Sequence, residues 1–253
     1  MSLEFATIVQ IRTQSTRLKN KVFLKIGEKP LIEHVVKRLM KSHLSQDVIV
    51  ATSTNPHDDV IERWCKKNKV LCYRGSEEDV LNRFVMAAQY YKVENVIRAC
   101  GDNPFIDFTF LDTLITSHEK CGADISNAFG SLVIGATAFE VIKTSVLVNI
   151  EKGADQKVYR EHVTTYIYNN PEKFTINSLE APEYLRRTPF RLTIDEADDL
   201  ELCRQLYTEI SRGGDFAYTS EEIISYLSKM PKIAKINSKV QQKDWKKELK
   251  EEH

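Results

Sequence analysis

Several features that often reveal a protein's function are missing from this sequence. The chain of 253 residues carries 36 basic and 36 acidic residues, so its net charge gives no reason to expect nucleic acid or a membrane surface as a partner. It has no apolar run of the ~18 residues that a membrane-spanning helix needs. Residues 1–4 lead directly into a predicted strand, without the apolar stretch of a signal peptide. We therefore expect a cytoplasmic protein.

Common chemical motifs are also missing. The five cysteines are odd in number and widely separated, which argues against a disulfide framework or a zinc site and favours small buried thiols in a reducing compartment. The sequence contains no Walker motif, no G-x-G-x-x-G and no G-x-S-x-G. If this chain binds a nucleotide, it does so without the usual glycine-rich cradle.

The N-terminal stretch lacks both acidic residues and glycine. Between Phe5 and Gly27 there is no Asp, Glu or Gly. An apolar run at 6–11 predicts a buried strand. The polar segment after it contains Arg12, Arg17, Lys19, Lys21 and Lys25. Because such charges repel one another unless they face water or hold an anion, we interpret this loop as a triphosphate site, with a solvated basic loop as the alternative.

Strands and helices alternate through the first hundred residues. The predicted strands are 6–11, 47–52, 70–73 and 95–100, and the predicted helices are 30–40, 58–68 and 76–91, the last capped by Ser76. This alternation predicts an α/β fold with a doubly wound, mostly parallel sheet. Ligands bind such sheets beyond the carboxyl ends of the strands, so we expect the turns 12–25, 74–76 and 102–105 near one crevice.

The alternation is less regular after residue 107. Here the pattern predicts helices at 140–150 and 157–170, and strands at 132–137, 174–179 and 190–194. We interpret 123–189 as an inserted lobe for substrate binding or dimer contact, within a single domain that covers 1–234. The tail 235–253 interleaves Lys and Glu around Trp245 without a hydrophobic stripe, and we interpret it as a surface appendage.

Two aspartates follow separate predicted strands. Asp102 lies just after strand 95–100, where Gly101 allows a close backbone approach, and Asp195 follows strand 190–194. Mg²⁺ prefers oxygen ligands and commonly takes one or two carboxylates together with substrate phosphates. Two aspartates facing a triphosphate therefore predict a Mg²⁺ site. Asp195 also precedes a predicted helix, so a helix cap is the alternative for that residue.

Six blocks of this sequence, in order, resemble the cytidylyltransferases that make CMP-activated acidic sugars, and most closely their spore-coat SpsF-type branch. The block QIRTQSTRLKNK at 10–21 resembles the family's loop Q-A-R-x-x-S-x-R-L-P-x-K. The other blocks are 50–53, 74–81, 101–107, 160–164 and 194–201. Lys19 replaces the family's proline and Lys25 lies beyond the motif, so we expect these two cations to be dispensable.

The resemblance implies a Rossmann-like nucleotide-diphospho-sugar transferase fold, a homodimer, and transfer of CMP from CTP to a nonulosonic or ulosonic acid for surface polysaccharide biosynthesis. Pyrophosphate would leave, and catalysis would come from positioning and charge neutralisation. The nucleotide-binding residues that it implies are Arg12, Ser15, Thr16, Arg17, Lys21, Arg74, Gly75, Ser76 and Gly101. Asp102 and Asp195 would hold Mg²⁺ and, with Arg12 and Lys21, would be catalytic.

The sequence departs from the family where the acceptor sugar is expected. The SpsF-type branch has an acidic stretch, P-D-G-x-D-V-E-V-F, where this chain has 132–139, with Thr137 and Phe139 roughly in place of the acids. That loss of negative charge would permit a carboxylated sugar. The resemblance implies acceptor contacts from Gly135, Thr137, Arg160 and His162. His162 is the plausible side-chain base, and a structural role on its helix is the alternative.

Two other functions remain open at this point. One is a glycosyltransferase of the same fold that uses a nucleotide-sugar, although Asp102 lacks the second aspartate of a D-x-D motif. The other is a catalytically silent nucleotide-binding protein, which the altered middle segment leaves room for.

Overall fold

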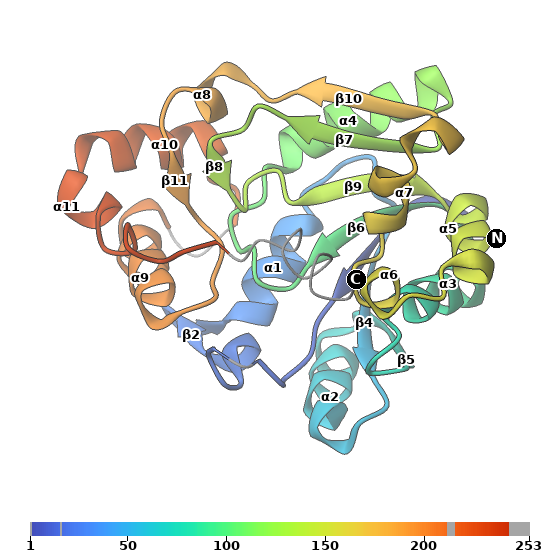
Figure 1. Cartoon of the computed structure of the whole chain (residues 1–253). Coiled ribbons are helices and arrows are strands. Elements are labelled where there is room, and N and C mark those ends of the chain that lie inside the picture. Colours follow the sequence, from blue (N-terminus) through green and yellow to red (C-terminus); the bar gives the residue numbers. More distant parts are fainter. Residues whose placement is uncertain (1, 16, 212–215, 243–253) are drawn as a thin grey trace.

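A seven-stranded sheet runs through the centre of the protein, whose residues 2–15, 17–211 and 216–242 are described by a computed structural model (Figure 1). The strand order is β10-β7-β9-β6-β1-β4-β5. Strands β6, β1, β4 and β5 are parallel, β9 is antiparallel to both β6 and β7, and β10 is parallel to β7. The strands are β1 (Leu3–Gln10), β4 (Val48–Ser53), β5 (Leu71–Gly75), β6 (Val93–Cys100), β7 (Ile125–Phe129), β9 (Phe139–Lys143) and β10 (Ile176–Glu180).

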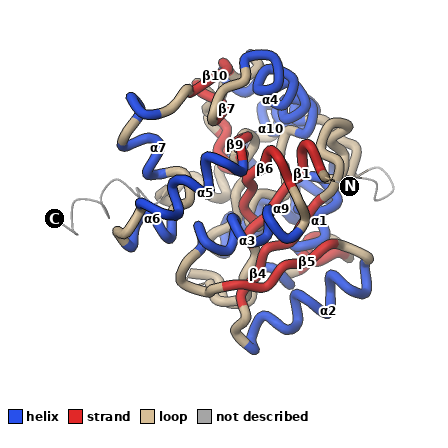
Figure 2. Tube along the Cα trace, turned by 90° about the vertical axis from the view of Figure 1, so that its right-hand side faces the viewer, coloured by secondary structure: helices blue, strands red, loops and turns tan. Residues whose placement is uncertain are grey.

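Helices cover both faces of this sheet (Figure 2). One hydrophobic core includes residues of α1 (Leu31–Leu39), α2 (Asp59–Asn68), α4 (Phe108–Cys121), α8 (Glu183–Arg186), α9 (Ala197–Ile210) and α10 (Ser220–Lys229). The other includes residues of α3 (Val80–Tyr90), α5 (Thr144–Gly153) and α7 (Thr165–Asn169), beside α6 (Lys157–Glu161). Successive strand residues alternate between the two cores, with Phe5 and Val9 in the first and Ala6 and Ile8 in the second. The predicted doubly wound, mostly parallel α/β fold is confirmed.

Short elements complete the chain. Two small sheets pair β2 with β3 and β8 with β11. These elements are β2 (Lys25–Ile26), β3 (Lys29–Pro30), β8 (Val133–Ile134), β11 (Phe190–Arg191), α11 (Pro231–Ala234) and the 3₁₀ turns η1 (Lys21–Phe23), η2 (Pro56–Asp58) and η3 (Pro171–Lys173). The strands predicted at 132–137 and 190–194 are therefore much shorter than expected.

Two helix predictions in the middle of the chain are wrong. The predicted helix 140–150 begins as strand β9, whose aromatic and β-branched residues extend the sheet by pairing with β6, and becomes helical only from Thr144. The predicted helix 157–170 is two short helices, α6 and α7, with a break at 162–164. The cap predicted at Ser76 is also displaced, because Asp79 caps α3 by accepting a hydrogen bond from Asn82 N–H.

The middle segment, 123–189, contributes β7, β9 and β10 to the same sheet as the N-terminal strands. Its role in acceptor binding or dimer contact stays a prediction. Trp245 and the rest of 243–253 lie outside the described residues. Within the ranges that the structure covers, no helix has the length and apolar character required to cross a membrane.

Candidate active site

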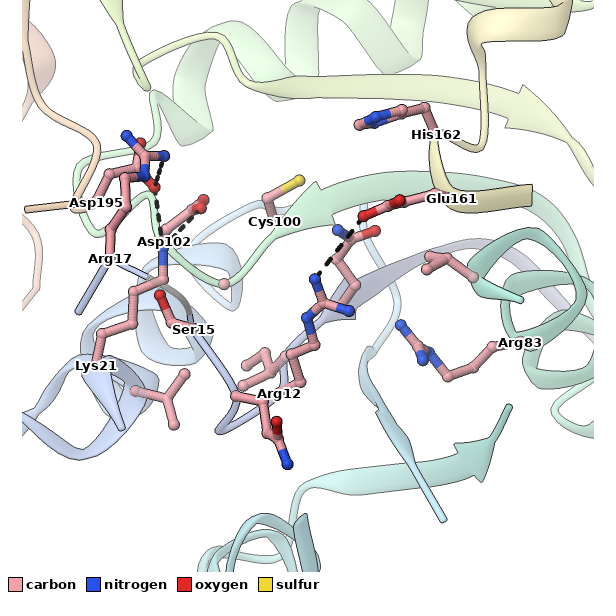
Figure 3. Close-up of a pocket in the computed structure, with 16 residues that line it drawn as sticks. Arg12, Ser15, Arg17, Lys21, Arg83, Cys100, Asp102, Glu161, His162 and Asp195 are labelled. Carbon is pink, nitrogen blue, oxygen red and sulfur yellow. Dashed lines mark hydrogen bonds and ion pairs between the residues drawn. The ribbon is translucent and has the colours of Figure 1, made fainter. Parts of the chain in front are cut away.

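A cavity of about 300 Å³ lies beyond the carboxyl ends of β1 and β6 (Figure 3). The loop after β1, the turn after β6, the segment before α9, and helices α3 and α6 all contribute to its walls. Its polar lining includes Arg12, Gln14, Ser15, Arg17, Lys21, Arg83, Asp102, Glu161, His162 and Asp195. The basic loop and both predicted metal-binding aspartates therefore face one space.

The start of the basic loop is held in place by Asp58. The backbone N–H and the hydroxyl of Thr13 donate to Asp58 Oδ1, at 2.8 and 2.7 Å. The hydroxyl of Ser53, at the end of β4, donates to Asp58 Oδ2 at 2.5 Å. Burial opposes ionisation of Asp58, but the hydrogen bonds from Ser53 and Thr13 outweigh it and lower the pKa of this carboxyl. An ionised buried acid thus fixes the loop against β4.

Gly101 allows the turn after β6 to approach the basic loop. A Cβ at this position would lie 2.6 Å from Ile11 Cγ1 and 2.9 Å from the Gln10 carbonyl oxygen, so a side chain would force the two segments apart. Ile194 N–H donates to the Asp102 carbonyl at 2.9 Å. That bond places the segments carrying Asp102 and Asp195 side by side, although strand β11 ends three residues before Ile194.

The two aspartates share one cation. Lys21 Nζ lies 3.2 Å from Asp102 Oδ2 and 3.1 Å from Asp195 Oδ1, and it also donates to the Ile194 carbonyl at 2.8 Å (Figure 3). Arg17 Nη2 reaches the same Asp195 oxygen at 2.9 Å. Burial would raise the pKa of Asp195, but the charges of Lys21 and Arg17 keep it below its usual value.

Asp195 is not the cap of helix α9. Glu196 occupies the cap position and forms a reciprocal capping box with Asp199. The helix-cap alternative for Asp195 is therefore wrong, and its side chain lies in the cavity instead.

The carboxylates of Asp102 and Asp195 fit a divalent cation that also has substrate ligands. Their oxygens converge on one point, where the Lys21 ammonium group now lies. Among the described residues, no group of three or more His, Cys, Asp and Glu side chains could hold a metal. A metal here would take its remaining ligands from phosphate and water, which is the manner in which Mg²⁺ usually binds.

The comparisons with known proteins agree with this geometry. The family model described as "Cytidylyltransferase" matches residues 6–230, which is most of the chain. The protein belongs to the cytidylyltransferase family. The spore coat polysaccharide biosynthesis protein SpsF of Bacillus subtilis is 36% identical over 90% of this chain and 95% of its own length. An uncharacterised protein of Methanocaldococcus jannaschii is 39% identical over 94% and 96%.

Solved structures agree with the fold. A cytidylyltransferase from Leptospira borgpetersenii superposes with a TM-score of 0.84 at 26% identity, covering 96% of this chain and 99% of that one. A CMP:2-keto-3-deoxy-manno-octonic acid synthetase complexed with CTP gives a TM-score of 0.63 at 16% identity, over 81% and 99%. The SpsF relative confirms the predicted resemblance to the SpsF-type branch. The solved structures confirm the predicted nucleotide-sugar transferase fold.

Part of the predicted nucleotide site of this cytidylyltransferase is not brought to the cavity. Arg74 and Gly75 are the last residues of β5, and Arg74 pairs with Asp59 at 2.7 Å and with Glu62 at 2.9 Å on helix α2. Neither these two residues nor Ser76 lines the cavity. Thr16 lies outside the described residues.

Two charged residues of the cavity were missed in the sequence. Arg83 lies on the buried face of α3, where its Nη1 donates to the Ser76 carbonyl at 2.6 Å and its buried Nε has no hydrogen-bond partner among the described residues. An arginine in register with Val80 and Ala87 on an apolar helix face was the available signal. Glu161 faces Arg12 across the cavity, with 4.0 Å between Nη2 and Oε1 (Figure 3). The sequence around Glu161 gives no comparable sign that this residue belongs to the site.

A second hollow, of about 600 Å³, adjoins the first through Cys100, which lines both. Its polar lining is Arg98, Asn127, Thr137, Glu140, Tyr168 and Asn169. Arg98 Nη1 donates to Glu140 Oε2 at 3.0 Å, and the Tyr168 hydroxyl donates to Glu140 Oε1 at 2.5 Å. Glu140 thus supplies negative charge that the sequence was expected to have lost. Glu140 belongs to strand β9, whereas the sequence pattern predicted a helix there.

The four predicted acceptor residues are divided between different environments. Thr137 lines the second hollow and His162 lines the first cavity. Gly135 is buried at a φ of +96°, and a Cβ there would lie 3.0 Å from Thr193 N, so the glycine allows close packing at this position. Arg160 lines neither space, because its guanidinium joins Asp79 to Glu151.

Proposed function

We propose that this cytidylyltransferase transfers CMP from CTP to an acidic sugar of the nonulosonic or ulosonic acid type and releases pyrophosphate. The observation that carries the proposal is the convergence of Arg12, Arg17 and Lys21 with Asp102 and Asp195 on one cavity. The adjoining polar hollow gives the acceptor a place beside the nucleotide. Two relatives, one named a spore coat polysaccharide biosynthesis protein and the other a 3-deoxy-manno-octulosonate cytidylyltransferase, support a sugar acceptor.

The cations of the cavity bind and neutralise the triphosphate in this proposal. Arg12, Arg17 and Lys21 each have a carboxylate partner in the structure, and phosphate oxygens form charge-assisted hydrogen bonds with the same groups. A guanidinium can hold two phosphate oxygens at once, whereas the Lys21 ammonium acts as a compact charge. Rate acceleration then comes from holding the α-phosphate in line with the attacking hydroxyl and from neutralising the leaving pyrophosphate.

Mg²⁺ is the proposed cofactor, held by Asp102 and Asp195. When bound, it supplies positive charge to the phosphates and lowers the pKa of a coordinated hydroxyl. The chain's own part is to aim both carboxylates at one point and to offer Lys21 as a mobile cation that can move from them to the substrate. His162 lines the same cavity and is the candidate side chain for accepting the proton of the attacking hydroxyl.

The second hollow is proposed to bind the hydroxylated, uncharged part of the acceptor. Arg98 and Glu140 neutralise one another there, so the hollow offers no excess positive charge for a carboxylate. Glu140, Asn127 and Thr137 instead provide acceptors and donors suited to hydroxyl or amide groups. We infer that the carboxylate of the sugar faces the basic cavity.

A homodimer is also proposed. Phe129, Leu132 and Ile134 are 50%, 45% and 39% exposed at the end of β7 and around β8, an unusual amount of apolar surface for one short segment. A second copy of this chain is the occupant that we expect. Sedimentation equilibrium of the wild type and of Leu132→Asp tests this, and a monomeric wild type would contradict it.

A pyrophosphate-release screen tests the activity. Four nucleoside triphosphates are combined with a panel of nonulosonic and ulosonic acids, with Mg²⁺ or with EDTA. We expect release with CTP, Mg²⁺ and at least one sugar acid, and its loss in Asp102→Asn with CTP binding retained. Tight CTP binding without turnover would favour a silent nucleotide-binding protein. A parallel incubation contains UDP- or CMP-sugars in place of the triphosphates, and hydrolysis or sugar transfer there would favour a glycosyltransferase.

A further inference from the structure

The C-terminal segment contains a residue that does not behave as part of a surface appendage. Asn237 is 3% exposed, although it follows the last helix and was predicted to lie in a solvated tail. Its amide nitrogen donates to the Arg191 carbonyl at 2.9 Å and to Asp199 Oδ1 at 2.8 Å. The prediction of a surface tail is therefore wrong for this part of the segment.

The two partners of Asn237 belong to a buried ionic network. Arg191 Nε donates to Asp199 Oδ1 at 2.8 Å, and both side chains are almost fully buried, with 7% and 0% exposed. Gln242, also in the C-terminal segment, accepts a hydrogen bond from Arg191 Nη1. Buried charges are stable only when they are paired and hydrogen-bonded, so each contact fixes the others. The tail thus completes the coordination of Arg191.

This network ends on Asp195. Arg191 Nη2 holds Asp195 Oδ2 at 2.8 Å, and Asp199 Oδ2 accepts the backbone N–H of Asp195 at 2.9 Å. Both the side chain and the backbone of Asp195 are therefore restrained from the side away from the cavity. The other oxygen, Oδ1, contacts Lys21 and Arg17. One oxygen of the Asp195 carboxylate therefore contacts the buried network, and the other contacts the cations of the cavity.

We propose that Asn237 is a positioning residue of the active site, acting through Arg191 and Asp199 to present Asp195 Oδ1 to the nucleotide. The inference rests on the proposed role of Asp195 and goes beyond it, because it makes the C-terminal segment part of the catalytic apparatus. Asn237 does not line the cavity, so its influence passes through its neighbours. Supporting residues of this kind typically contribute 10- to 100-fold to activity or metal affinity.

The test compares Asn237→Ala, Asn237→Asp and the matched control Ser238→Ala. Ser238 is exposed and belongs to the same segment, and among the described residues its hydroxyl donates only to the nearby Lys235 carbonyl, so its removal leaves the network intact. Asn237→Asp keeps the size of the side chain but removes the donor and adds a charge beside Asp199. We expect kcat to fall about tenfold in Asn237→Ala and more in Asn237→Asp, with the KM for CTP within about twofold of wild type.

A double-mutant comparison separates positioning from packing. Arg191→Lys loses the fork that holds Asp195 and Asp199 together. If Asn237 acts through Arg191, adding Asn237→Ala to Arg191→Lys lowers kcat by much less than it lowers wild-type kcat. Equal, additive losses would overturn the inference, as would an Asn237→Asp enzyme as active as Ser238→Ala. Thermal unfolding of each variant shows whether it is folded.

The inference and the proposed function fail in different ways. A wild type that transfers CMP to no sugar acid overturns the proposed function alone. The Mg²⁺ concentration that half-saturates the thermal stabilisation by CTP then serves as the readout, and Gln242→Ala, at an exposed position, replaces any Asn237 variant that does not fold. A half-saturating Mg²⁺ concentration more than twofold higher in these variants than in Ser238→Ala supports the inference. A value within twofold of Ser238→Ala in all of them overturns it.

Discussion

Replacing Lys21 with methionine removes the ammonium group that joins the two site aspartates while keeping most of the side chain. In the wild type this group contacts Asp102, Asp195 and the Ile194 carbonyl. The change leaves two carboxylates facing one point without the cation between them. We therefore expect two opposite effects. The activity should fall, and the response of the unliganded protein to divalent cations should increase.

The structure allows the size of each effect to be worked out. Breaking a fully buried ion pair costs about 3–5 kcal/mol. Lys21 is 13% and Asp102 27% exposed, and Asp195 retains Arg17 and Arg191, so we expect a loss of only about 1–2 kcal/mol in the free energy of unfolding. Removing a positioned charge from the developing charge of a transition state costs about 10²–10³ in kcat, and that is the loss expected here.

Three measurements on Lys21→Met check this reasoning. Pyrophosphate release gives the activity, urea unfolding gives the stability, and thermal unfolding with and without Mg²⁺ gives the metal response. Lys25→Met is the matched control, because Lys25 is 66% exposed and lies 4.0 Å from Glu28, outside the cavity. We expect Mg²⁺ to raise the unfolding temperature of Lys21→Met more than that of wild type, and Lys25→Met to resemble wild type in all three.

Two results would refute this reasoning. Wild-type activity in Lys21→Met would show that the ammonium group contributes nothing to triphosphate binding or turnover. An equal Mg²⁺ response in Lys21→Met and wild type would show that Asp102 and Asp195 do not form a cation site, whatever the activity.

Three further predictions concern other parts of the site. Asp58→Asn should lower the free energy of unfolding by about 1–3 kcal/mol at neutral pH. Because folding lowers the pKa of Asp58, the stability difference between the variant and wild type should shrink as the pH falls below about 4. Urea unfolding at several pH values checks this. Arg83→Ala should raise the dissociation constant for CTP, whereas Arg74→Ala should leave it unchanged and cost about 1 kcal/mol or less in stability, as calorimetric titration and urea unfolding will show. Glu140→Gln should change the KM for the sugar and not for CTP, and an unchanged sugar KM would exclude the second hollow as the acceptor site.

Local sequence determined much of the fold. The apolar runs of β1, β4 and β6 predicted buried parallel strands because a strand covered on both faces has no polar side. The same pattern located the carboxyl ends of β1 and β6, and with them Arg12, Lys21 and Asp102. In the middle of the chain, short strands and short helices have similar compositions, and tertiary pairing decides which of the two forms. Residues 139–143 become strand β9 because they pair with β6.

Only the tertiary structure decided which charged residues share a space. Arg74 and Arg83 are both close in sequence to β5, yet Arg74 turns toward Asp59 and Glu62 while Arg83 faces the cavity. Glu140 meets Arg98 because an antiparallel register places them opposite one another.

The clearest case is Asn237. Its local sequence is that of a solvated tail, with no periodic apolar face. Its burial depends on Arg191 and Asp199, which lie 46 and 38 residues away in the chain. The periodicity of a sequence indicates which residues of a single helix or strand become buried. It carries no information about long-range pairing of polar groups, and that pairing is what aims Asp195 at the site.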